Sequence, residues 1–150
     1  MSEGKRPGGL TALAIINFVF FGFGVIGLPS MVATYADLIP TDHLLPEQKA
    51  AMEAVQSIAL PVFIFIMILS SVTTVLVLLS GIGYLKEKRV LGRIIGSTYA
   101  VLGIVNTIIA ALTFPSESYG GFQIRTIIDL IYPLLTLILL NTTFKEDLTN

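Results

Sequence analysis

Long apolar runs separated by short polar segments dominate this chain, and four of them have the length of a membrane span. The runs cover about residues 10–32, 58–85, 94–114 and 124–144. A helix needs about 20 mostly apolar residues to cross the hydrocarbon core of a bilayer. The first three runs are uncharged, whereas the fourth contains Asp129 and has Arg125 at its outer end. The pattern predicts an all-α integral membrane protein, with residues 1–150 forming one antiparallel four-helix transmembrane bundle.

The segment 33–57, between the first and second runs, is the longest polar connection in the pattern. Pro46 suits the first position of a helix, and an acidic residue follows it in the first turn. Met52 and Val55 then lie on one face of that helix, with charged residues on the other. The segment therefore predicts an outer loop with a short amphipathic helix over about 46–57, and any kink at Pro61.

The basic residues predict the orientation, because Lys and Arg concentrate in short cytoplasmic loops. Lys49 and Arg125 fall on one side of the predicted bundle. The other side holds Lys5, Arg6, Lys86, Lys88, Arg89, Arg93 and Lys145. We therefore expect both termini in the cytoplasm and the chain in the plasma (cell or inner) membrane. Cleavage of the first run as a signal peptide is the alternative, although its apolar core exceeds the usual length of about 7–15 residues.

Small and polar residues recur every three or four positions along the third run. This stripe consists of Gly92, Gly96, Tyr99, Gly103, Asn106, Ala110 and Thr113. Small residues let helices approach closely in lipid, and polar ones form hydrogen bonds across the contact. The stripe therefore predicts a helix-packing face. Less regular stripes follow the other runs: Ala14, Asn17, Phe21 and Gly24; Met67, Ser70, Thr74, Val77 and Gly81; and Arg125, Asp129, Tyr132, Thr136, Leu139 and Thr143.

Asp129 marks a candidate functional site, because an ionisable residue within a span is costly and is often functional. Arg125 lies one turn before it, so an ion pair at the outer interface would satisfy both groups. Pro133, one turn later, removes the helical donor for the carbonyl at position 129. We group these three residues with Asn17, Ser70 and Thr74 as a candidate intramembrane polar site. Its polar groups either join the helices or line a hydrated path.

Composition and charge exclude several classes of function. Only 13% of the residues are charged, about half the value of roughly 25% for a soluble domain. The formal net charge of −1 gives no basic surface for nucleic acid. The chain has no Cys and a single His, His43, so thiol catalysis, Cys-type zinc sites and paired-histidine haem sites lack their ligands. We expect no enzymatic activity, no cofactor and no metal.

The remaining hypothesis is an accessory, assembly or scaffold subunit that acts through lateral helix packing. Its expected partners are the lipid bilayer and other membrane proteins, in a homo- or hetero-oligomer. Two alternatives stay open. One is a channel or transporter component that handles ions or protons through the polar seam and Asp129. The other is an envelope sensor that uses the outer loop 33–57.

Overall fold

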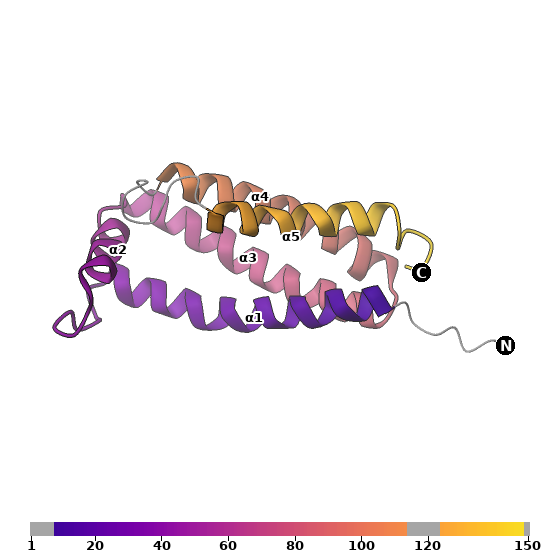
Figure 1. The fold of residues 1–150 in the computed structure, drawn as a ribbon, viewed down its shortest axis with the longest axis horizontal. Helices are drawn as coiled ribbons and strands as arrows, with labels where there is room; N and C mark the ends of the chain where they lie inside the picture. The colour runs from indigo at the N-terminus through magenta and orange to yellow at the C-terminus, as the bar shows by residue number, and fades with distance from the viewer. Residues whose placement is uncertain (1–7, 114–123, 149–150) are drawn as a thin grey trace.

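The structure is a computed structural model that describes residues 8–113 and 124–148, and every regular element in these ranges is a helix. Figure 1 shows their arrangement. In chain order they are α1 (Gly8–Tyr35), α2 (Pro46–Gln56), α3 (Leu60–Leu85), the π-helix η1 (Arg89–Ile94), α4 (Ile95–Thr113) and α5 (Ile124–Asn141). The prediction of an all-α fold is confirmed for the described residues.

Three helical segments are long and apolar enough to cross a membrane. They are α1, α3 and the continuous run Arg89–Thr113 formed by η1 and α4, with 28, 26 and 25 residues. At about 1.5 Å per residue each is about 38–42 Å long, which exceeds the roughly 30 Å of a hydrocarbon core. Their length and apolar composition are compatible with a membrane protein. The fourth predicted span corresponds to α5, whose described apolar part, Asp129–Asn141, is shorter.

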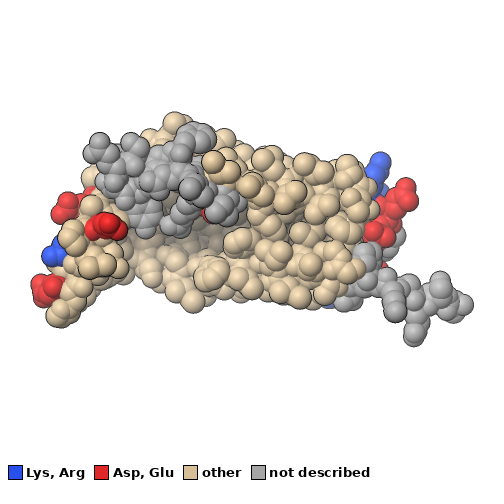
Figure 2. Space-filling view, viewed as in Figure 1, with Lys and Arg blue, Asp and Glu red and all other residues tan. Residues whose placement is uncertain are grey.

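The four long helices lie side by side, with α1 packed on α3, α3 on η1 and α4, and α4 on α5 (Figure 1). The start of α1, the turn between α3 and η1, and the end of α5 share one end of the molecule, and α2 lies across the opposite end. Most of the acidic and basic side chains visible in Figure 2 gather at these two ends. The long sides of the molecule are instead apolar, with Phe23 66% and Ile68 60% exposed. Such a surface needs lipid or another apolar partner to cover it.

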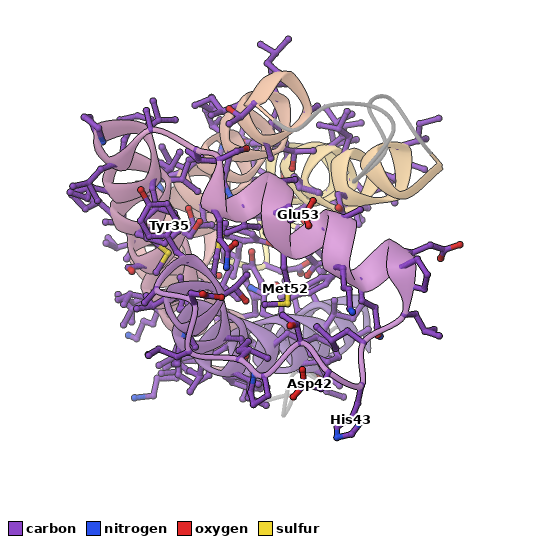
Figure 3. The ribbon with its side chains drawn as sticks, turned by 90° about the vertical axis from the view of Figure 1, so that its left-hand side faces the viewer. Tyr35, Asp42, His43, Met52 and Glu53 are labelled. Carbon is purple, nitrogen blue, oxygen red and sulfur yellow. The ribbon has the colours of Figure 1, made fainter. Side chains whose placement is uncertain are left out.

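The amphipathic pattern of α2 explains why this helix lies across the end of the bundle. Its first turn is closed by a hydrogen bond from the backbone N–H of Leu45 to Oε1 of Gln48 (2.9 Å). Met52 and Val55 are buried, whereas Glu53 is exposed. In Figure 3, Met52 lies just below α2, and Asp42 and His43 lie in the loop that precedes α2.

The connection from α2 to α3 differs from the expected kink at Pro61. The helix is interrupted at 57–59, and Pro61 falls in the first turn of α3. Proline is tolerated there because the first turn does not need its N–H. Tyr35 holds the interruption in place, since its ring stacks on Phe63 with centroids 3.8 Å apart and its hydroxyl donates to the carbonyl of Ile58 (3.1 Å). The break lets α2 turn away from the axis of α3.

An apolar cluster closes the end of the molecule at which α1 begins. Its buried members are Leu10, Leu13, Ala14, Tyr84, Leu140, Phe144 and Leu148. They come from α1, α3, α5 and the segment that follows α5. The cluster therefore joins the two ends of the described chain and covers one side of the polar residues described next.

Candidate functional site

A single buried amide on α1 connects all four long helices. Asn17 is 0% exposed. Its Nδ2 group donates to Oγ of Ser80 (2.6 Å) and to the carbonyl of Val77 (3.3 Å), both on α3. Its Oδ1 atom accepts hydrogen bonds from the hydroxyls of Tyr99 on α4 (3.2 Å) and Tyr132 on α5 (2.5 Å). A carboxamide offers two N–H groups and two lone pairs, so the bundle uses the full hydrogen-bonding capacity of this side chain.

Other polar side chains gather around this amide. We call the group the polar cluster: Asn17, Ser80, Tyr84, Tyr99, Tyr132 and Thr136. Ser80, Tyr84 and Thr136 are 0% exposed, and Tyr99 is 3% exposed. Every member is an amide or a hydroxyl. The cluster therefore brings no formal charge into the interior, which keeps the cost of burying it low.

Two members of the polar cluster, Thr136 and Tyr84, form no hydrogen bond to Asn17. The hydroxyl of Thr136 donates to the carbonyl of Tyr132 in the preceding turn of α5 (2.9 Å). The hydroxyl of Tyr84 lies near Ser80 and Asn17, yet no described atom forms a hydrogen bond with it. Gly96 leaves the space for this phenol, because a Cβ atom added at position 96 would lie 2.4 Å from the Tyr84 oxygen. A close glycine contact therefore positions the ring.

The predicted stripe of the third run divides into two halves in the structure. Gly92, Gly96 and Tyr99 are buried. The two glycines face α3 and the C-terminal part of the chain around the end of α5, whereas the hydroxyl of Tyr99 reaches Asn17 on α1. Gly103, Asn106, Ala110 and Thr113 are only partly buried. A Cβ atom added at Gly103 would lie 3.6 Å from Pro133, an ordinary contact distance. Close packing of the kind that the stripe predicts is thus concentrated in its first half.

The five described side chains of the candidate intramembrane polar site do not form one site. Asn17 is the centre of the polar cluster, whereas Ser70 and Thr74 lie nearer the start of α3, beside a separate cavity of about 560 Å³. This outer cavity lies between α1, α2 and α3, and Gly24, Gly27, Ser30, Thr34 and Gln48 also line it. Ser70 accepts a hydrogen bond of 3.4 Å from Nδ2 of Asn106, whose Oδ1 has no partner among the described atoms.

Asp129 and Pro133 belong to neither feature. The side chain of Asp129 is exposed on α5, whereas Pro133 is buried and faces Gly103. α5 continues through Pro133 without a break. The side chain of Arg125 lies outside the described part of the chain, and so does the predicted pairing of Arg125 with Asp129.

Sequence reasoning missed Ser80 and Tyr84 as members of the site. Both lie on α3 beyond Val77, a stripe residue that the structure also brings to Asn17. The spacing of Val77, Ser80 and Tyr84 is three and then four residues. From Val77, a step of three residues leads to Ser80 and then to Tyr84, whereas a step of four leads to Gly81. Both steps fit a helical stripe, and the prediction followed only the second.

The described residues contain no group of three or more His, Cys, Asp or Glu side chains that could hold a metal ion. The polar cluster instead offers hydroxyl and amide groups that are hydrogen-bonded mainly to one another. No protein-family model, no curated protein and no solved structure matches this chain.

Proposed function

We propose that the chain is a four-span integral membrane protein without enzymatic activity, and that it works as an accessory, assembly or scaffold subunit through lateral helix packing. In this proposal α1, α3, η1 with α4, and α5 cross the plasma (cell or inner) membrane as an antiparallel bundle. Both termini and the turn between α3 and η1 lie in the cytoplasm, in agreement with the distribution of Lys and Arg.

The saturated amide of Asn17 is the observation that carries the proposal. Its donors and acceptors are all used between helices, so this amide has no capacity left for a ligand. Interhelical hydrogen bonds of this kind join helices in lipid. The interior therefore favours a structural role, and the long apolar sides remain as the surface through which the protein can act. α1 offers Val19, Phe23 and Ile26 at helical spacing, each at least 52% exposed.

Photo-crosslinking in native membranes tests the proposal. A photoreactive amino acid placed at Phe23 should form a covalent adduct with a second polypeptide, either another copy or a different membrane protein. The matched control is Leu13 on the same helix, which is 6% exposed and should yield only crosslinks within the chain. Mass spectrometry of the adduct identifies the partner. Adducts to lipid alone at position 23, and at neighbouring exposed positions, would contradict lateral association.

The outer cavity favours a second candidate, a component that handles an ion or a small solute. Serine, threonine and glutamine side chains line part of this cavity, which is about 560 Å³ in volume. Ion and proton flux into liposomes that contain the purified protein tests it, with Thr74→Val and Asp129→Asn as variants. Flux that either variant abolishes would favour transport over the scaffold role. Absence of flux with the wild-type protein would contradict the transport hypothesis.

A further inference from the structure

A groove with two arginines lies on the surface where η1 and the start of α4 meet the end of α5. Its volume is about 390 Å³. The lining residues are Arg89, Arg93, Ile94, Ser97, Thr98 and Asn141. None of them belongs to the polar cluster or to the outer cavity, so the groove is a separate feature of the molecule.

Close packing of two glycines fixes the backbone that carries both arginines. A Cβ atom added at Gly83 on α3 would lie 2.2 Å from the backbone nitrogen of Gly92. The chain therefore reverses tightly after α3, with Glu87 in the left-handed region at φ 52°. η1 begins directly after this turn, at Arg89. π-Helical segments are rare and frequently occur at functional sites.

Hydrogen bonds then orient Arg93 within the groove. Its Nε atom donates to Oδ1 of Asn141 at 3.3 Å. Nδ2 of Asn141 donates to the carbonyl of Leu137 (2.9 Å) and to Oγ of Ser97 (3.2 Å). The amide of Asn141 is thus held by α5 and α4, and it presents its oxygen to the guanidinium. Because Asn141 is neutral, this contact orients the guanidinium without bringing a negative charge to it.

The donors left in the groove fit an oxyanion. The remaining N–H groups of Arg93 and the guanidinium of exposed Arg89 are charged donors in the planar geometry that suits phosphate. The Ser97 hydroxyl accepts the bond from Asn141 and keeps its own proton to donate. Thr98 differs, because its hydroxyl donates to the carbonyl of Ile94 (2.9 Å).

An apolar side chain at the same groove indicates that the phosphate is carried by a lipid. Ile94 lines the groove and is 53% exposed, and Val90 on η1 is 58% exposed. The arginines lie at the start of a segment that is long and apolar enough to cross a membrane. Charged donors beside an exposed apolar surface match the boundary between the headgroup and the acyl chains of a phospholipid.

From this arrangement we propose that the groove formed by Arg89, Arg93 and Ser97 binds the phosphate of an anionic phospholipid headgroup. The guanidinium groups hold the phosphate oxygens, and the first part of the acyl chain lies against Ile94. The site is specific for a negatively charged lipid, because a zwitterionic headgroup such as phosphocholine brings its own cation to the two arginines.

Native mass spectrometry of the purified protein tests the proposal. The protein is taken from vesicles with equal amounts of phosphatidylglycerol and phosphatidylcholine, and retained lipids are counted for wild type, Arg89→Gln, Arg93→Gln and Lys145→Gln. Lys145→Gln is the matched control, because it removes one positive charge after the end of α5 and outside the groove. We expect wild type to retain phosphatidylglycerol, and each arginine variant to retain about fivefold less. The control should keep the wild-type preference.

Three outcomes would overturn the proposal. The first is equal retention of the two lipids by the wild-type protein. The second is an equal loss in Lys145→Gln and the arginine variants, which would show that general surface charge holds the lipid. The third comes from titration with inorganic phosphate: displacement of phosphatidylglycerol at low millimolar phosphate would assign the groove to the free ion. Arg89→Gln shows whether lost binding merely reflects misfolding. Arg89 is exposed, and its replacement leaves the contact between Arg93 and Asn141 intact.

Discussion

Replacement of Asn17 by alanine should destabilise the protein more than any comparable polar substitution in the helices. The substitution removes the hydrogen bonds to Val77, Ser80, Tyr99 and Tyr132. Side-chain hydrogen bonds between transmembrane helices contribute about 0.6 kcal/mol each on average. Four of them give a loss of between about 2 and 3 kcal/mol. The space vacated by the amide adds to this loss, because the site is fully buried.

Asn106→Ala is the matched control for this prediction. Asn106 is also an asparagine within a spanning helix, but it is only partly buried and forms one interhelical bond of 3.4 Å, to Ser70. Its removal should cost about 0.6 kcal/mol or less. Asn17→Leu separates the two causes of the Asn17 effect, because leucine fills the space but cannot form the hydrogen bonds.

Unfolding in mixed micelles, followed by the loss of helical circular dichroism as the fraction of denaturing detergent rises, measures the differences. We expect the order wild type, Asn106→Ala, Asn17→Leu and Asn17→Ala from most to least stable. If Asn17→Ala were as stable as Asn106→Ala, the amide would not join the helices, and the structural interpretation of the polar cluster would fail.

Three further predictions concern packing, the position of α2 and topology. Gly96→Ala should cost about 1–3 kcal/mol in the same unfolding assay, because the added methyl group meets the buried phenol and Leu140; Gly103→Ala, which has room for a methyl group, should cost much less and would contradict this argument if it cost the same. Tyr35→Phe keeps the ring stack but removes the hydroxyl bond across the break between α2 and α3, so amide hydrogen exchange in 46–56 should become faster while exchange in α4 is unchanged. Since the chain has no cysteine, single cysteines can report topology: one at Asp42 should react with an impermeant maleimide in intact cells, and one at Lys145 should react only after the membrane is opened. The reverse labelling pattern would invert the proposed orientation.

The helices could be predicted from the sequence because the bilayer imposes a simple requirement on length and polarity. The runs predicted at 10–32 and 58–85 correspond to α1 at Gly8–Tyr35 and α3 at Leu60–Leu85. Asn17 could be singled out because an amide is rare in an apolar run and costly to bury without partners. These inferences depend on local composition alone.

The membership of the polar cluster could not be predicted in the same way. α3 is apolar around most of its circumference, and Ser70, Ser71, Thr73 and Thr74 point in different directions. Nothing local therefore says which face turns toward Asn17. The π-helix η1 depends on the close contact of Gly83 with Gly92, and the break before α3 is accompanied by the stacking of Tyr35 on Phe63. Both are tertiary contacts, and the spacing of hydrophobic and polar residues along the sequence does not indicate which residues will form them.

The hydrogen-bond partners of Asn17 are also synthesised in a fixed order. A ribosome makes the chain from its N-terminus, so the partners of the α1 amide are synthesised in the order Ser80 of α3, Tyr99 of α4 and Tyr132 of α5. Until α5 is made, the amide oxygen has only one of its two hydrogen-bond donors. α5, the last helix to be synthesised, thus supplies the last hydrogen bond to Asn17 on α1, the first helix. A chain that lacks α5 therefore leaves the amide oxygen of Asn17 without the hydrogen bond from Tyr132.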